Sequence, residues 1–209
     1  MEIATPSARS VFEAFSGFSR RRAPAERCDL CGAAVAAEHP HLLRVADDQI
    51  QCACDPCATL FAHRELEPGR KLIRIPRDAR KLPSFELSDA DWSGLRLPID
   101  LAYFVYRHAS GRMVAYYPSP AGSTESLLSL GAWAEIERRN PALTQMQPGV
   151  EALLADRTRG NRRYFIAPID QCSRLTGLIR THWRGFSGGQ AVWEKVDEFF
   201  RTLQERARA

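Results

Sequence analysis

The stretch CACDPC, at residues 52–57, places three of the chain's six cysteines within six residues. A second group of cysteines lies upstream in CDLCG, at residues 28–32. Each stretch contains one CxxC pair, and two such pairs supply four thiolates, the ligand set of a closed tetrahedral zinc site. The predicted metal ligands are Cys28, Cys31, Cys54 and Cys57.

The residues between and after the two pairs predict a treble-clef zinc finger. HLLRV at residues 41–45 and QIQCA at 49–53 flank a short polar turn, which indicates a β-hairpin. Asp55 is a favoured N-cap and Pro56 suits the first position of a helix, so we expect a helix to begin there. A cysteine knuckle, a hairpin and a helix that carries the last two ligands form the plan of a treble clef.

Cys52 and the identity of the metal leave alternatives open. Using Cys52 in place of Cys54 would give CxxxxC spacing, which makes a poorer chelate, so we interpret Cys52 as a small buried packing residue. Iron is the alternative to zinc, because four thiolates also suit a rubredoxin-type centre or an iron-sulfur cluster. The ferredoxin run C-x2-C-x2-C is absent, so zinc is expected.

Two histidines precede and begin the predicted hairpin. His39 and His41 raise the hypothesis of a His-metal nuclease, because treble clefs also frame these enzymes and their catalytic metal. The Asp-His pair expected in the first strand and the His or Asn expected on the following helix are not evident, although His63 lies nearby. Nuclease activity is therefore not expected.

The chain as a whole is predicted to be α+β. After the finger we expect a small antiparallel sheet with helices, because aromatic and β-branched runs alternate with helical periods. The predicted units are an amphipathic, basic arm at 1–26 that contains Arg20–Arg22, a metal-binding unit at 27–67, a linker or edge strand at 68–91, and an α+β domain at 92–209.

Residues 92–209 contain several predicted elements. A hairpin is expected because two runs of strand-forming residues flank Ser110 and Gly111. The other segments follow from helical periods, strand composition and turn residues. The predicted elements are strands at 101–109, 112–117 and 163–169, a turn-rich segment at 118–126, and helices at 130–139, 149–157, 170–183 and 189–206.

Composition excludes some classes of protein. Hydrophobic residues at 44% and charged residues at 26% are typical of a globular chain. The net charge of +4 allows an acidic partner or nucleic acid but indicates neither, so nucleic acid is not the expected partner. No apolar run approaches the ~18 residues of a membrane span, and no signal peptide is evident. The cytoplasm, where thiols stay reduced, is the expected compartment.

A basic edge near the carboxy terminus is a candidate binding surface. Arg174, Arg180 and Arg184 form the basic group, and such residues bind carboxylates or phosphates, although internal salt bridges would explain them equally well. His182 is expected to be a hydrogen-bonded core residue. No GxSxG elbow or catalytic triad is present, which favours a non-enzymatic role. The candidate surface residues are Arg180, His182, Arg184, Tyr117, Ser119 and Glu125.

Several blocks carry a family resemblance. These are CDLCG, CACDPCATLF, YPSPAGSTES, GVEALLADR, IDQCSRLTGLIRTHWRGFSGG and VWEKVDEFF. Together they resemble a family of uncharacterised bacterial proteins often encoded beside uptake NiFe-hydrogenase genes and their maturation factors. The resemblance covers roughly residues 27 to 204. It implies an accessory role for a hydrogenase and gives no reaction.

Three hypotheses of function follow. The first is a non-enzymatic accessory protein that binds a hydrogenase subunit or maturation factor through its zinc finger and basic surface. The second is a redox or metal-delivery protein that carries iron on the cysteine cluster, with Cys52 as a fifth thiol. The third is a zinc-finger nucleic-acid binder. The features that favour it are the Arg20–Arg22 block and the net charge of +4.

Overall fold

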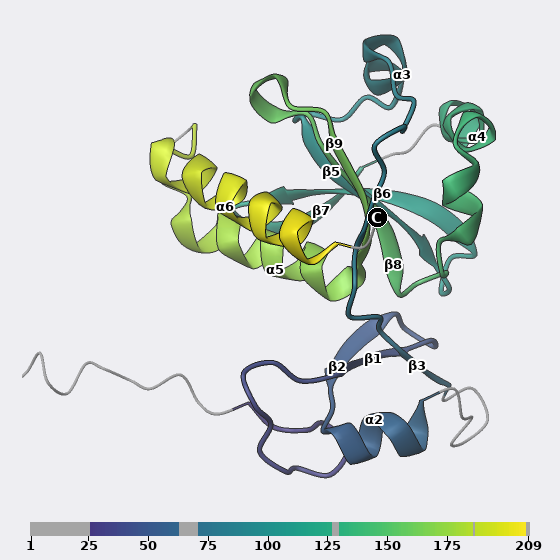
Figure 1. The fold of residues 1–209 in the computed structure, drawn as a ribbon, viewed down its shortest axis with the longest axis vertical. Helices are drawn as coiled ribbons and strands as arrows, with labels where there is room; N and C mark the ends of the chain where they lie inside the picture. The colour runs from purple at the N-terminus through teal and green to yellow at the C-terminus, as the bar shows by residue number, and fades with distance from the viewer. Residues whose placement is uncertain (1–25, 63–70, 127–129, 186, 208–209) are drawn as a thin grey trace, which may run out of the picture.

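Two β-sheets organise the chain. The computed structural model describes residues 26–62, 71–126, 130–185 and 187–207. Residues 1–25 of the predicted arm and His63 therefore lie outside the described residues. We call residues 26–62 and 71–75, with the three-stranded sheet, the finger. The remaining described residues contain the six-stranded sheet, and we call them the sheet domain (Figure 1).

The finger has the predicted hairpin followed by the predicted helix. β1 (His41–Arg44) pairs with β2 (Gln49–Cys52), and β3 (Leu72–Arg74) pairs with the other edge of β1, all antiparallel. The helix α2 spans Asp55–Phe61. Asp55 is the first helical residue rather than the N-cap, because Cys54 remains extended and occupies the cap position without a side-chain hydrogen bond.

The sheet domain is built on a six-stranded antiparallel sheet in the order β4-β9-β8-β5-β6-β7. The hairpin predicted from aromatic and β-branched residues is β5 and β6, and the predicted strand near residue 165 is β9. The strands are β4 (Arg80–Lys81), β5 (Leu101–Arg107), β6 (Arg112–Ser119), β7 (Gly122–Ser126), β8 (Glu151–Asp156) and β9 (Arg163–Pro168).

Two predicted segments differ in the structure. The predicted helix at 149–157 is wrong: Glu151–Asp156 form β8, whose residues are all buried. A central strand buried on both faces is a continuous apolar run, which periodicity alone does not separate from a helix. The predicted turn at 118–126 is mostly strand. Pro118 is tolerated there because β6 extends past its pairing with β5 and meets only the edge strand β7.

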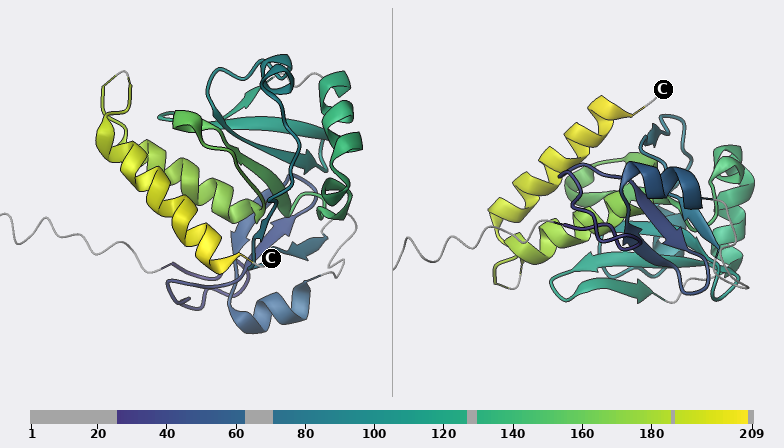
Figure 2. Two further views of the ribbon diagram at one scale, coloured as in Figure 1. Left: turned by 45° about the horizontal axis from the view of Figure 1, so that its top comes forward. Right: turned by 90° about the horizontal axis from the view of Figure 1, so that it is seen from below.

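Helices cover both faces of the six-stranded sheet (Figures 1 and 2). Alternation along β5 directs Tyr103 and Val105 to one core and Phe104 to the other. The first core is closed by α5 (Ile169–His182) and α6 (Gln190–Arg206), which confirms the two predicted carboxy-terminal helices. The second is closed by α3 (Asp89–Gly94), α4 (Leu130–Arg139) and the 3-10 helix η1 (Pro141–Gln145). A further 3-10 turn, η2, spans Thr158–Gly160.

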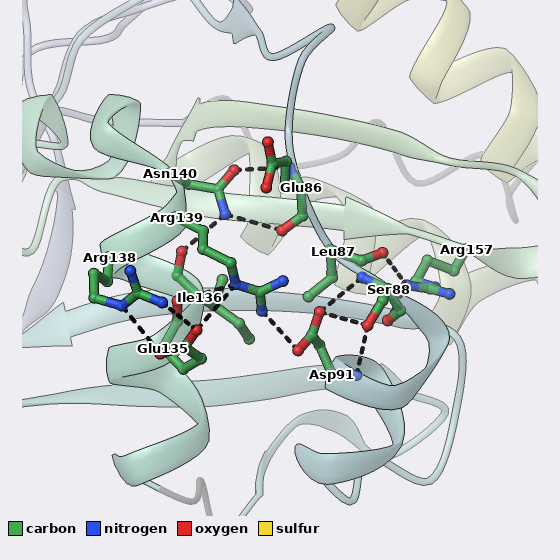
Figure 3. A network of polar contacts seen from close by, with 10 residues as sticks. All are labelled: Glu86, Leu87, Ser88, Asp91, Glu135, Ile136, Arg138, Arg139, Asn140 and Arg157. Carbon is green, nitrogen blue, oxygen red and sulfur yellow. Dashed lines mark hydrogen bonds and ion pairs between the residues drawn. The ribbon is translucent and has the colours of Figure 1, made fainter.

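A polar network joins α3 to the end of α4 (Figure 3). Asp91 closes a capping box with Ser88 and pairs with Arg139 at 2.6 Å. These two partners, Arg139 foremost, lower the pKa of the Asp91 carboxyl to about 2. The Asn140 side chain accepts a hydrogen bond from the Glu86 backbone N–H and donates one to its carbonyl. The network thus adds polar contacts between two helices whose apolar side chains share one core cluster.

The finger packs on the sheet domain through an apolar cluster. Leu43 of β1, Ile75 and Val150 are buried together. Gly149 has a φ of +76°, and a Cβ there would collide with His108 and with Leu43. The close approach of the two units therefore requires glycine at this position.

A buried carboxylate also ties the two units together. The side chain of Asp48, in the finger's hairpin turn, is only 4% exposed. It accepts hydrogen bonds from Arg107 Nε at 2.8 Å and from the backbone N–H groups of His108 and Ala109. Burial alone would raise the pKa of Asp48, but these donors outweigh it and lower the pKa. The carboxylate is therefore held in its charged form at the junction.

Candidate metal centre

The cysteine knuckle, residues 28–32, is hydrogen-bonded to the end of the hairpin. The Gly32 N–H donates to the Cys28 carbonyl at 2.8 Å, and Gly32 has a positive φ of 73°, which closes the tight turn. The Asp29 N–H donates to the carbonyl of Cys52 at 2.9 Å, and Asp29 Oδ2 accepts from the Cys52 N–H at 2.7 Å. This pair of bonds brings the first CxxC pair next to the second.

The four predicted ligands are brought together. The sulfur atoms of Cys28, Cys31, Cys54 and Cys57 lie within 4.8 Å of one another, and the Sγ atoms of Cys31 and Cys54 are 3.7 Å apart. Zinc–sulfur bonds of about 2.3 Å in a tetrahedron would place the sulfurs about 3.8 Å apart. The residues present therefore fit a tetrahedral metal ion.

Burial and hydrogen bonding shift the pKa values of the cysteine thiols in different directions. Burial raises the pKa of Cys28, but N–H groups of Cys54, Leu30 and Cys31 donate to its sulfur and lower the pKa to about 6. Burial and the neighbouring thiols raise the pKa of Cys57. Four thiolates this close repel one another, so a divalent cation is what allows all four to lose their protons together.

Four protein ligands leave no position open for a substrate. Such a closed centre is structural in character, and its thiolate donors suit both zinc and iron. Cys28 and Cys57 are buried in the finger, and Cys31 is exposed at its surface. What the site can do chemically is hold a metal ion that cross-links the knuckle to α2.

A second group of potential ligands lies on the hairpin. One ligand atom from each of His39, His41 and Cys52 lies within 4.8 Å of the others. His41 and Cys52 are directly opposite across β1 and β2, and the two imidazole rings have centroids 4.6 Å apart. Cys52 therefore lies beside two histidines and outside the four-cysteine cluster. Burial, with the charges of Asp29 and Glu26, raises the pKa of its thiol.

Both histidines use Nδ1 for another contact. His39 Nδ1 lies 2.8 Å from the Ala36 carbonyl oxygen, and His41 Nδ1 lies 2.9 Å from Asp170 Oδ2. Asp170 belongs to the first turn of α5 in the sheet domain, 129 residues away in the chain. The predicted hairpin already implied that His41 and Cys52 lie opposite each other. No local feature of the sequence indicated the contact between His41 and Asp170.

The predicted surface at the end of α5 is mostly engaged in local contacts. Arg184 donates to the carbonyls of Thr181 and Trp183, and His182 Nδ1 donates to the Leu178 carbonyl at 2.9 Å. Arg180 is exposed. His182 is thus hydrogen-bonded as predicted, but it is half-buried and does not belong to the core.

The predicted partners on β6 and β7 do not converge with one another. Glu125 is opposite Tyr116 and pairs with Arg112 at 3.1 Å. Tyr117 and Ser119 follow the opposite alternation, so they project from the other face of the sheet. The six candidate surface residues therefore form no single pocket.

A basic groove lies instead between α5 and α6. Its cavity volume is about 230 Å³, and basic side chains line it with Glu198. Lys195 pairs with Glu198 at 2.6 Å, whereas Arg174 has no ion-pair partner among the described residues. Arg174 belongs to the predicted basic group, and the sequence alone does not distinguish it from Arg180 and Arg184. The basic residues of the groove are Arg77, Arg174, Lys195 and Arg206.

The fold and the site define a mixed α+β protein with a four-cysteine cluster able to bind a metal. The chain belongs to a family of unknown function, DUF5947, whose model matches residues 27–207. This match confirms membership of an uncharacterised family and covers both the finger and the sheet domain. No curated protein and no solved structure matches the chain. Within the described ranges, none of the helices has the length and apolar character needed to traverse a bilayer.

Proposed function

We propose that the protein is a non-enzymatic accessory protein, in which a finger built on a structural zinc supports a binding surface for a protein partner. The observation that carries this proposal is the four-thiolate cluster, because its closed ligand set fits a structural metal and leaves no place for a substrate. A metal ion held by the cluster would cross-link the knuckle to α2, and the finger in turn packs on the sheet domain.

The groove between α5 and α6 is the surface we assign to the partner. Four basic side chains and one carboxylate line the groove, and Arg174 has no ion-pair partner among the described residues. Arginine forms strong, charge-assisted hydrogen bonds with carboxylates. Arg206 reaches from the groove to Glu38 of the finger, at 3.4 Å, so the finger borders the same surface. The chemistry fits an acidic segment of a protein.

The partner we propose is a NiFe-hydrogenase subunit or one of its maturation factors. The support is the resemblance of the CxxC, YPSPAGSTES and IRTHWRG blocks to proteins encoded beside uptake hydrogenase genes. Under this proposal the protein acts in the cytoplasm during assembly of the enzyme.

Affinity capture combined with a gene deletion tests this function. A tagged full-length chain is expected to retain a hydrogenase component, and hydrogenase activity is expected to fall in a deletion strain. Arg174→Glu should weaken capture, because it reverses the charge of the groove. Arg138→Glu is the matched control, because Arg138 is exposed on α4, across the sheet, where it pairs with Glu135. Absence of any hydrogenase component together with normal hydrogenase activity would refute the proposal.

Metal delivery is the second candidate function. The observation that favours it is the group of His39, His41 and Cys52, which offers ligands outside the closed cluster. A delivery protein needs a site from which a metal ion can leave, and three ligands hold an ion less completely than four. Rapid transfer of a bound metal ion from the protein to a chelator, without unfolding, would support this candidate.

A further inference from the structure

The hairpin carries a cluster that the closed centre does not use. His41 and Cys52 are cross-strand neighbours, and His39 lies just before β1, with its ring 4.6 Å from that of His41. One ligand atom from each of the three lies within 4.8 Å of the other two. Two imidazoles and one thiolate form a familiar ligand set for zinc and related transition metals.

The hydrogen bonding of His39 leaves one of its two ring nitrogens without a partner among the described residues. Its side chain is 5% exposed, and its Nδ1 lies 2.8 Å from a carbonyl oxygen, so Nδ1 carries the proton and donates it. The other nitrogen, Nε2, is buried and has no hydrogen-bond partner among the described residues. Buried polar atoms of this kind are nearly always satisfied, and a neutral imidazole nitrogen with a free lone pair is a metal ligand.

The state of His41 points the same way. Asp170 Oδ2 lies 2.9 Å from Nδ1, so that nitrogen donates to a carboxylate and Nε2 is left with its lone pair. A carboxylate behind a histidine is the usual support of a metal-binding imidazole, because it fixes the ring and raises its basicity. Asp170 is 20% exposed, and its second oxygen is buried without a hydrogen-bond partner among the described residues. The negative charge behind the cluster favours a cation in front of it.

We propose that His39, His41 and Cys52 form a second metal site, which binds a divalent transition metal of the zinc class through three protein ligands. The two histidines bind through Nε2, and the Cys52 thiol binds as thiolate, losing its proton to solvent. The fourth position is open to water or to another ligand, so this site exchanges its metal more readily than the closed four-thiolate centre. Asp170 is a positioning residue, and it makes the site depend on the sheet domain as well as on the finger.

Cobalt titration of the full chain tests this inference. Protein that holds one tightly bound zinc per chain is titrated with Co²⁺ and followed by visible absorption and native mass spectrometry. The wild-type chain is expected to take up one further metal ion, with the absorption of a cobalt site that has a single thiolate. His41→Gln and Cys52→Ala are each expected to lose this ion and to keep the tightly bound zinc. The retained zinc shows that the finger of each variant is folded.

His182→Gln is the matched control. Nδ1 of His182 is also engaged by an oxygen atom, a backbone carbonyl, but His182 belongs to no cluster of ligands found in the described residues. This variant should bind both metal ions. Asp170→Asn should keep both sites but weaken the second by about 10- to 100-fold, as loss of a supporting carboxylate does elsewhere. Uptake of one ion only by the wild-type chain, or a second ion that survives in both His41→Gln and Cys52→Ala, would overturn the proposal.

Discussion

The finger and the sheet domain are held together by different means. Among the described residues, the finger has one cluster of six buried residues, and two of these are the cysteines Cys28 and Cys57. The sheet domain has two clusters of sixteen and fourteen buried residues, one on each face of its sheet. A core as small as that of the finger rarely supports a fold alone. The comparison indicates that a metal ion held by the four cysteines would stabilise the finger, whereas the sheet domain is stabilised by its two apolar cores.

Loss of a cysteine ligand is expected to have the largest effect, and only on the finger. Cys57→Ser leaves three thiolates, and the metal-binding free energy that folds such small units is on the order of 10 kcal/mol. In hydrogen exchange by mass spectrometry, β1, β2 and α2 of the variant should lose protection, while β5 and β8 keep theirs. Cys172→Ala is the control, because Cys172 is fully buried on the inner face of α5 and belongs to no metal cluster found in the described residues. Equal loss of protection in both units would contradict the comparison.

Loss of a buried carboxylate in the sheet domain is expected to destabilise that domain without affecting the metal site of the finger. Asp156 is fully buried and accepts hydrogen bonds from Thr158, Asn161 and Arg163. Asp156→Ala leaves the buried donors of Thr158, Asn161 and Arg163 without their acceptor and should lower the free energy of unfolding by about 3 kcal/mol. Urea denaturation followed by tryptophan fluorescence measures this change, and the metal content of the folded protein should not alter.

The control for this experiment is Asp197→Ala. Asp197 is half-exposed and also pairs with Arg163, so its removal should cost no more than about 1 kcal/mol. Equal effects of the two substitutions would mean that burial of the Asp156 carboxylate is not what stabilises this end of the sheet.

The junction between the units should show a smaller, pH-dependent effect. Asp48→Asn removes a buried charge that accepts from Arg107 and two backbone N–H groups, at a cost of about 1–3 kcal/mol. The folded pKa of Asp48 lies below its unfolded value, so its contribution is present above the unfolded pKa and is lost as the pH falls through the folded pKa.

Urea denaturation at several pH values measures this effect. Because the contribution of Asp48 is lost in acid, the difference in free energy of unfolding between wild type and Asp48→Asn should decrease as the pH falls. Asp47→Asn is the matched control, because Asp47 is exposed and pairs only locally with Arg44. A difference that stays constant with pH would show that charge at Asp48 does not link the units.

The sequence predicted the finger better than the sheet domain because the information in the finger is local. CxxC spacing, the hairpin and the Asp55–Pro56 helix start lie close together in the chain, and the four ligands meet as these patterns indicate. The strand β8 was predicted as a helix because a run buried on both faces has no strand-like alternation. That environment is created by β5, β9 and two layers of helices, which are distant in sequence.

The candidate sites show the same division. Pairing of His41 with Cys52 follows from the hairpin register and could have been predicted. The contact of His41 with Asp170 could not, because 129 residues and a whole domain separate them. The alternation that sends Tyr117 and Glu125 to opposite faces depends on the pairing of β6 with β7, a segment that reads as a turn from its proline, serine and glycine content.

Metal analysis of the anaerobically purified full chain tests the central claim most directly. The protein is dialysed against a mild chelator, its metal content is measured, and its visible absorption spectrum is recorded. We predict one zinc per chain that resists the chelator, held by Cys28, Cys31, Cys54 and Cys57, and no visible absorption band. Stoichiometric iron with a visible band, or a metal-free chain whose finger keeps full hydrogen-exchange protection, would contradict the account.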